Sequence, residues 1–265
     1  YNVIGAGREF RTVGHTGNLD GERLRAICIG QVRHNIDVID GFLLISASGS
    51  KHAVEISRTV KERGLKTLVL TNNPNAPVKD VVEKGSLVVF PKNREPYTYN
   101  TSTYMGMLLS QSQIDVGELL TFLHNEVSKS IPKNLAEYEA FFLIIPERFT
   151  QMRGLLVAKF DELFGPRVMA RAYTCEQTKH ARTVVQHEQE LFVSFVEDNV
   201  LFGIPENRIT IPLPENADYV AFMAVSYYFI GHLQKQLPAY YMNRIAAYVE
   251  ETSRMFGSKM SVIVE

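Results

Sequence analysis

The first part of the chain alternates short apolar runs with stretches of helical periodicity. Each run has three to five residues and is almost continuously apolar, which is typical of strands in a sheet covered on both faces. Between two of the runs, apolar residues at helical spacing end at Gly64, a favoured C-cap residue, and predict a helix over 53–63. The predicted strands are Asn2–Ile4, Arg25–Ile29, Phe42–Ser46, Thr67–Leu70 and Ser86–Phe90.

A second cycle of the same kind follows a predicted long helix over 104–129 and a linker over 130–139. This alternation predicts an α/β fold with two doubly wound parallel sheets, flavodoxin-like and three-layered (αβα), in two domains, 1–130 and 131–265. The second cycle consists of strands Phe141–Ile145, Val168–Ala170, Leu191–Phe195 and Arg208–Pro212, and helices over 148–163, 219–231 and 239–255.

The second domain is expected to be abridged. Only residues 197–207 separate its third strand from the next one. A parallel crossover needs about a dozen residues or more, usually with a helix. We therefore expect one strand–helix unit to be missing or replaced by a loop.

Composition excludes several classes of protein. The 265 residues are 45% hydrophobic with a net charge of −1, enough for one large core or two modest ones and too neutral for a typical nucleic-acid binder. The longest apolar run, 219–231, is shorter than the ~20 residues of a bilayer span, so no membrane association is expected. Residues 1–4 read as a strand and not as a basic leader. The two cysteines cannot form a disulfide framework and favour a cytoplasmic location.

The segment ISASGSKH, residues 45–52, joins a predicted strand to a predicted helix. Ligands of parallel α/β sheets bind beyond the carboxyl ends of strands, where free amides at a helix N-terminus favour an anion. An ordinary serine N-cap is the alternative, but three serines with a glycine and a lysine favour phosphate. The expected phosphate ligands are Ser46, Ala47, Ser48, Gly49, Ser50 and Lys51.

Neither a dinucleotide nor a metal is expected. Gly5-Ala6-Gly7 follows the first predicted strand, but a dinucleotide fingerprint would need a glycine where Phe10 stands. We interpret the segment as a tight strand exit beside the phosphate loop. His187 with Glu188 or Glu190 lacks the spacing of a metal site, and we expect no cofactor.

The first domain resembles the sugar isomerase (SIS) domain family. LLISASGSKHAVEISRTVKERGLKTLVLTNNPNAPV, residues 43–78, is similar to the family signature of a strand, S-x-S-G-x-[TS], a helix, a strand and T-x-N-P. YNTSTYMGMLL, residues 99–109, resembles the family's second phosphate-side segment and implies Ser102 and Thr103 as further ligands. Lys51 stands where the family has Thr or Ser, and it would hold phosphate as a point charge.

The second domain resembles the second SIS domain in the isomerase half of glucosamine-6-phosphate synthases. FFLIIPERFTQMRGLLVAKFDELFG (141–165), AYTCEQTKHA (172–181) and the tail GSKMSVIVE (257–265) carry this resemblance. It implies a glutamate base in the second segment, a ring-opening role for His180, and Lys259 as the imine-forming lysine. Aligning the Lys-His pairs places Gln177 at the base position, with Glu176 one residue away, or ~100° around a helix.

Other residues near these segments are weaker candidates. Glu188 and Glu190 could supply a carboxylate, with a solvated helix edge as the alternative. Glu95 could face the ligand, and Cys175 as a nucleophile is a minority alternative. Tyr97, Tyr99 and Tyr104 could contact a sugar or pack against a core or a neighbouring subunit.

The resemblance implies aldose–ketose isomerisation through an enediol, which needs a general base, a ring-opening group and stabilisation of an oxyanion. We expect an isomerase-like enzyme for a hexose or amino-sugar phosphate, with Glu176, His180 and Lys259 as catalytic residues. A phosphosugar sensor without turnover, and a deaminase or deglycase on the same scaffold, are the alternatives. No glutaminase segment precedes the pair, so no ammonia release from glutamine is expected. The resemblance also implies a homodimer, for which the apolar 219–231 and Met-rich 104–109 segments are suited.

Overall fold

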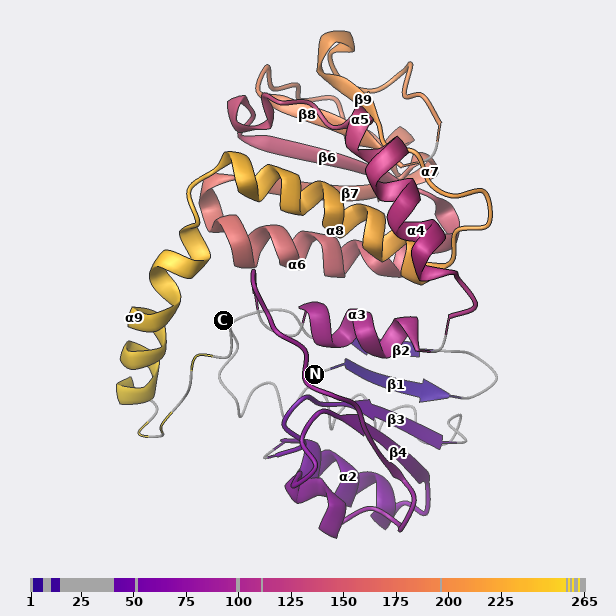
Figure 1. The fold of residues 1–265 in the computed structure, drawn as a ribbon, viewed down its shortest axis with the longest axis vertical. Helices are drawn as coiled ribbons and strands as arrows, with labels where there is room; N and C mark the ends of the chain where they lie inside the picture. The colour runs from indigo at the N-terminus through magenta and orange to yellow at the C-terminus, as the bar shows by residue number, and fades with distance from the viewer. Residues whose placement is uncertain are drawn as a thin grey trace. The chain divides into compact units, whose positions relative to one another are not determined.

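A computed structural model describes residues 2–6, 11–14, 41–50, 52–98, 101–110, 112–195 and 197–255, with 257, 259 and 262. The chain divides into two compact units, Tyr1–Asn93 and Arg94–Glu265, and each is described by itself (Figure 1). This division reflects which residues pack together, and it does not identify SIS domains. The boundary at residue 130 between the two predicted SIS domains stays a prediction.

The first unit contains a five-stranded sheet, sheet A, of order β2-β1-β3-β4-β5 (Figure 1). Strands β3 (Gly41–Ile45), β4 (Lys66–Thr71) and β5 (Leu87–Val89) are parallel, as predicted. Helix α2 (His52–Glu62) packs its buried apolar residues on one face of the sheet, and the short helix η2 (Pro77–Asp80) follows β4. Their common core consists of Phe42, Leu44, Ala53, Ile56, Val60, Val69, Ala76 and Val78.

The N-terminal strands differ from the expectation. Strand β1 (Asn2–Ala6) is antiparallel both to β2 (Arg11–Gly14) and to β3. Ala6 pairs with Gly41, so β1 ends beside the first residue of β3. The serine segment follows the other end of β3. The interpretation of Gly5-Ala6-Gly7 as a strand exit beside the phosphate loop is therefore wrong. The predicted strand Arg25–Ile29 lies outside the described residues.

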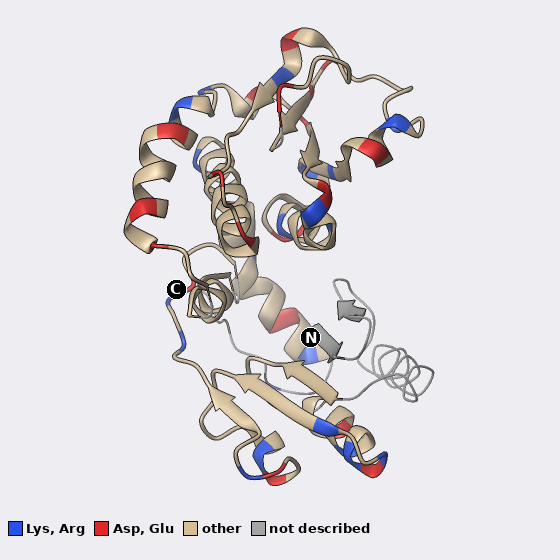
Figure 2. Cartoon of the chain, turned by 90° about the vertical axis from the view of Figure 1, so that its right-hand side faces the viewer, with Lys and Arg blue, Asp and Glu red and all other residues tan. Residues whose placement is uncertain are grey.

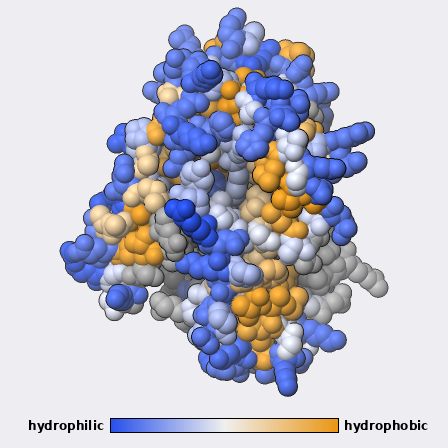
Figure 3. All heavy atoms as spheres, viewed as in Figure 1, coloured by the Kyte–Doolittle hydropathy of each residue, from blue (hydrophilic) through white to orange (hydrophobic). Residues whose placement is uncertain are grey.

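The other face of sheet A carries partly exposed apolar side chains. Leu43 is paired in register with Leu68, and Leu70 with Val88, so these residues share one face. Leu68 is 41% exposed and Val88 37%. Apolar side chains gather over β3 and β4 in the space-filling view (Figure 3).

The second unit contains sheet B, of order β7-β6-β8-β9, in which every pairing is parallel. Parallel strands flanked by helices thus occur in both units, which confirms the predicted α/β fold. Helices α6 and α8 lie on one face of sheet B (Figure 1), where Phe141 contacts Phe160 and Phe229 at ring distances of 5.5 and 6.0 Å. The elements are β6 (Ala140–Ile145), α6 (Arg153–Phe164), β7 (Met169–Thr174), α7 (Cys175–Lys179), β8 (Glu190–Ser194), β9 (Arg208–Thr210), α8 (Tyr219–Gln236) and α9 (Tyr240–Met255).

The single helix predicted over 104–129 is wrong. The chain forms α3 (Thr101–Leu109) and then, after a break, α4 (Val116–Phe122), the π-helical turn η3 (Leu123–Val127) and α5 (Ser128–Ser130). The break is held by Asp115, which accepts a hydrogen bond from Glu118 N at 2.9 Å, because an N-cap aspartate begins a new helix. The remaining short 3₁₀ helices are η4 (Leu135–Glu137), η5 (Glu147–Met152), η6 (Gly165–Arg167) and η7 (Pro205–Asn207).

The outer face of sheet B is covered by a loop, which confirms the abridged second lobe. Phe142, Ile144 and Phe192 form a buried cluster there, and Phe202 of the β8–β9 connection packs on it. Between β8 and β9, the described residues form no helix longer than η7. The Arg208 side chain holds the loop through hydrogen bonds to the carbonyls of Val200, Phe202 and Gly203.

The described helices and strands carry mixed surface charge, and none of these helices is suited to crossing a membrane. Lys and Arg residues are interspersed with Asp and Glu in the described parts of both units (Figure 2). Among the helices that the structure describes, none combines the length and apolar character required to cross a bilayer.

Candidate functional site

The serine segment leaves β3 in a loop that is held from within. Ser46 continues the ladder, because its N–H donates to Leu70 O at 2.9 Å. Its side chain is buried, and its hydroxyl accepts the N–H of Gly49 at 3.2 Å. The Ser46 hydroxyl therefore shapes the loop, with its acceptor side engaged inside the protein.

Three consecutive carbonyls of the loop point toward the segment that follows β4. Ala47 O accepts from Thr71 Oγ1 at 2.9 Å, Ser48 O accepts from Asn73 Nδ2 at 2.9 Å, and Gly49 O accepts from Val78 N at 3.0 Å. In a trans peptide unit, the N–H points opposite to the carbonyl before it. The amides of residues 48–50 therefore face away from the 71–78 segment, and among them the Gly49 N–H is bound by Ser46 Oγ.

The open side of the loop carries two hydroxyl groups. Ser48 Oγ and Ser50 Oγ lie 2.9 Å apart, with Ser48 exposed and Ser50 half-buried. Ser50 O accepts the N–H of Ala53 at 3.0 Å, at the start of α2. Helix-start amides, a positive helix end and paired hydroxyls together form a surface that suits an anion. The predicted ligand Lys51 lies outside the described residues.

Gly49 is required by both conformation and contact. Its φ of +59° is left-handed, and a Cβ built on it would lie 2.5 Å from Ala76 Cβ. Any side chain would clash with the 71–78 segment, so the loop can approach that segment only with glycine here. Thr71 and Asn73 are site residues that the sequence reasoning did not assign, although the T-x-N-P motif was the available signal.

The second predicted phosphate segment is occupied by a carboxylate of the chain itself. Glu95, only 2% exposed, accepts the N–H of Ser102 at 2.8 Å and the N–H of Thr103 at 2.9 Å. A carboxylate at the first turn of α3 satisfies amides that otherwise have no helical partner. Glu95 therefore occupies the backbone donors that a phosphate at Ser102 and Thr103 would use. These residues belong to the second unit, and the serine loop to the first.

The predicted catalytic segment forms the short helix α7, and Gln177 belongs to its capping box. Gln177 N donates to Thr174 Oγ1 at 3.3 Å, and Thr174 N donates to Gln177 Oε1 at 3.2 Å. This reciprocal pair is a capping box. The residue at the family's base position is thus engaged in starting the helix.

Glu176 is exposed and pairs with Lys179, whose Nζ lies 2.5 Å from Glu176 Oε1. The hydrogen bond and charge of Lys179 lower the pKa of Glu176, and Glu176 raises the pKa of Lys179. A carboxylate with a lowered pKa is a weaker base than an unpaired one. His180 ends the same helix and is exposed, as is Lys259.

Two further glutamates follow strands at the carboxyl edge of sheet B. Glu147 comes after β6, and its Oε1 accepts the N–H of Glu176 at 3.2 Å, while Glu197 comes after β8. Burial, followed by the charges of Glu197 and Glu147, raises the pKa of the Cys175 thiol. A thiol in this environment is a poor nucleophile. In the sequence, each of these glutamates follows a predicted strand, and that position could have identified both as candidate site residues.

Glu190 is not at a solvated helix edge, so that alternative is wrong for this residue. It begins β8, is 3% exposed, and receives hydrogen bonds at 2.7–3.0 Å from the guanidinium of Arg171. A buried carboxylate held by a bidentate arginine is engaged in the structure of the sheet. Glu188 is exposed and stays a candidate.

Solved structures share this fold. The C-terminal domain of glucosamine-fructose-6-phosphate aminotransferase from Francisella tularensis matches with a TM-score of 0.56 and 13% identity, over 78% of this chain and 75% of that one. Glucosamine-6-phosphate deaminase from Thermotoga maritima matches with a TM-score of 0.53 and 16% identity, over 73% of this chain and 69% of that one.

The chain has an SIS-type fold. At these identities the similarity concerns the fold alone. No family model matches the chain, and no curated protein sequence matches it. The resemblance inferred from residues 43–78 is therefore confirmed at the level of the SIS fold, and the roles of the site residues stay predictions.

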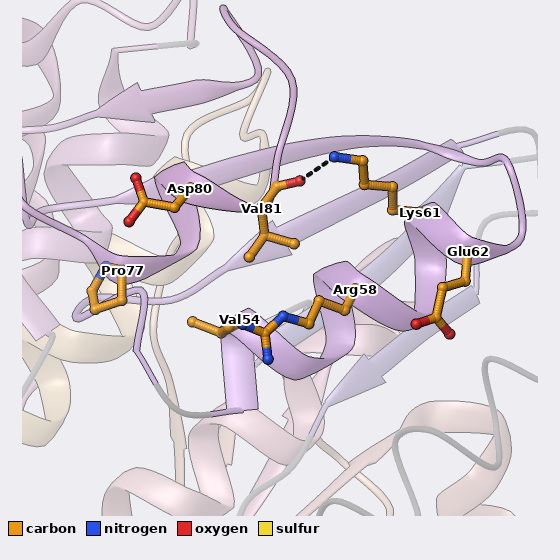
Figure 4. Close-up of a pocket in the computed structure, with 7 residues that line it drawn as sticks. All are labelled: Val54, Arg58, Lys61, Glu62, Pro77, Asp80 and Val81. Atoms are coloured by element: carbon orange, nitrogen blue, oxygen red, sulfur yellow. Dashed lines mark hydrogen bonds between the residues drawn. The ribbon is translucent and has the colours of Figure 1, made fainter.

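A hollow of about 610 Å³ lies beside α2 in this SIS fold (Figure 4). Lys61 borders it and donates a hydrogen bond from Nζ to Val81 O at 2.9 Å. None of the predicted phosphate ligands that the structure describes lines it; its residues are Val54, Arg58, Lys61, Glu62, Pro77, Asp80 and Val81. Within the described ranges, no three His, Cys, Asp or Glu side chains are grouped so that they could hold a metal ion.

Proposed function

We propose that this protein binds a hexose or amino-sugar phosphate, with the phosphate on the serine loop of residues 46–51. The observation that carries the proposal is the orientation of the loop. Its carbonyls are bound by Thr71, Asn73 and Val78, so the amides of Ser48 and Ser50 face away from that segment, and the hydroxyls of the same two residues lie 2.9 Å apart. The first turn of α2 adds a positive end, and Lys51 would add a charge.

Aldose–ketose isomerisation through an enediol is the activity that the resemblance implies for such a ligand. Glu176 or a neighbouring carboxylate would move the proton, His180 would open the ring, and Lys259 would form an imine. Deamination or deglycation on the same scaffold would also need Lys259. Glu147 and Glu197, at the carboxyl edge of sheet B, are further candidates for the base.

A sensor without turnover is the second candidate function. Two observations favour it: Gln177 is engaged in the capping box, and the carboxylate of Glu176 is paired with Lys179. A glutamate in place of Gln177 would offer a stronger base than the amide. The abridged second lobe also fits a protein that binds without converting.

Binding is tested by calorimetric titration of fructose-6-phosphate into the protein and into a Ser48→Ala, Lys51→Ala double variant. We expect the double variant to lose binding at the serine loop. The matched control is Lys84→Ala with Ser86→Ala. It removes the same residue types just before β5, at the amino end of the parallel strands, whereas the serine loop follows the carboxyl end of β3. Equal affinity in the double variant and the wild type would contradict the proposal.

Turnover is tested by incubating the protein with fructose-6-phosphate in heavy water and measuring deuterium at C1 and C2. Exchange that Glu176→Gln or Lys259→Ala abolishes would support isomerisation with the assigned residues. Binding without exchange would support the sensor. Sedimentation analysis tests the proposed homodimer, and cell fractionation tests the proposed cytoplasmic location.

A further inference from the structure

Two arginine side chains lie against one tyrosine ring at the edge strand of sheet B. β7 is the edge strand, and Tyr173 lies near its carboxyl end. The guanidinium carbon of Arg153 lies 4.5 Å from the centroid of the Tyr173 ring, and that of Arg182 lies 5.0 Å from it. The two arginines belong to different parts of the chain: Arg153 is the first residue of α6, and Arg182 follows α7.

Each arginine is positioned by its backbone surroundings. Arg153 Nε donates to Ala172 O at 2.6 Å, which covers an edge carbonyl of β7, while its terminal nitrogens have no hydrogen bond to the described residues. Arg182 follows Ala181, whose φ is +59°. An alanine in the left-handed region is strained, and such conformations persist where the surroundings require them. Here the turn brings Arg182 back over Tyr173.

The charge of this pair is not balanced by an ion pair in the described part of the chain. The neighbouring Arg171 is neutralised by Glu190, and its Nη1 donates to Arg182 O at 2.9 Å. No ion pair among the described residues joins Arg153 or Arg182 to a carboxylate. Arg182 is also exposed, so an anion can reach it from solvent.

We infer that Arg153, Tyr173 and Arg182 form a phosphate-binding site in the second unit, separate from the serine loop. The planar guanidinium presents paired donors that match the oxygens of a phosphate, and stacking on an aromatic ring fixes its plane. The ligand is a phosphate group, either inorganic phosphate or the phosphate of a sugar ester.

The test is a calorimetric titration of inorganic phosphate into the full chain and its variants. We expect two equivalents in the wild type, and loss of one, or at least about a tenfold weaker affinity, in Arg182→Ala. Arg254→Ala, an exposed arginine on α9, is the matched control. Repeating the titration with fructose-6-phosphate and with fructose distinguishes a sugar ester from free phosphate.

The outcomes separate this site from the proposed function. Loss of an equivalent in Ser48→Ala, Lys51→Ala but not in Arg182→Ala would overturn this inference and leave the proposed function standing. Loss in Arg182→Ala alone would support this site and contradict phosphate binding by the serine loop. Phosphate should also slow phenylglyoxal modification of wild-type Arg182, measured by peptide mass spectrometry. An unchanged rate would overturn the site without any variant.

Discussion

Gln177 and Thr174 cap each other at the start of α7. Each donates its backbone N–H to the other's side chain, at 3.3 and 3.2 Å. The resemblance to SIS proteins places a glutamate base at this position, and the chain has an amide that is engaged in helix formation instead. The relationship explains how the segment can keep its fold without the carboxylate.

Gln177→Ala should therefore cost about 1 kcal/mol of unfolding free energy, because it removes one half of the capping box. Gln177→Glu should be close to neutral, since glutamate is equally suited to the third position of such a box. Urea denaturation of both variants measures the difference. Equal stability of Gln177→Ala and the wild type would show that the cap contributes nothing.

A carboxylate at residue 177 also tests the sensor hypothesis. If the missing base alone prevents turnover, Gln177→Glu should gain deuterium exchange with fructose-6-phosphate. Continued absence of exchange, with binding retained, would mean that the rest of the second lobe also lacks the catalytic geometry.

Gly49 provides a second prediction, with Gly64 as its matched control. Both have positive φ, +59° and +73°, but a Cβ on Gly64 would meet nothing within 4 Å, whereas one on Gly49 would lie 2.5 Å from Ala76 Cβ. Gly64→Ala should cost roughly 1 kcal/mol from backbone strain alone. Gly49→Ala should cost more and should also weaken fructose-6-phosphate binding. Denaturation and titration of both variants measure the two effects, and similar losses in both would contradict the close packing.

The strand–loop–helix unit around residue 46 was predictable because its local signals agree. An apolar run, a break of small polar residues and a 3.6-residue period each indicate the same boundary, and β3 and α2 lie where they are expected. The direction of β1 was not predictable, because a short apolar run does not encode its pairing partner. Strand β1 also pairs with β2, a strand that the hydrophobic pattern did not predict.

The candidate site was predictable only where it is continuous in sequence. The serine loop is one segment, and its partner Asn73 lies in a motif of the same resemblance. Glu95 is seven and eight residues from the amides it binds, and no local rule links a loop glutamate to them. Glu147 and Glu197 are separated by 50 positions and share only the carboxyl edge of one sheet. Convergence of this kind depends on tertiary structure.

Glu95 leads to a third prediction. Glu95→Ala removes two charge-assisted hydrogen bonds at the start of α3 and should cost about 2–4 kcal/mol of unfolding free energy. Glu95→Gln retains an acceptor and should cost less. The vacated amides would form an anion site, so inorganic phosphate should raise the midpoint of urea unfolding more in Glu95→Ala than in the wild type. Equal effects of phosphate on both proteins would show that these amides do not bind an anion.

Cys175 leads to a prediction about pH. Burial and the charges of Glu197 and Glu147 raise the pKa of its thiol, so its alkylation by iodoacetamide should become fast only above the ordinary range of a thiol. Glu197→Gln should shift this profile to lower pH, because one of the opposing charges is removed. Exposed Glu206→Gln serves as the control. Peptide mass spectrometry separates Cys175 from Cys28, and a profile in the ordinary thiol range would contradict the assigned environment.

The same shift sets the sign of a pH dependence of stability. The native thiol keeps its proton to higher pH than the unfolded thiol, so its contribution to the unfolding free energy is present in full below the unfolded pKa. That contribution is lost as the pH rises through the native value. Cys175→Ser should therefore flatten the alkaline limb of the stability profile, because a serine hydroxyl does not titrate there. An unchanged alkaline limb in Cys175→Ser would show that another group controls it.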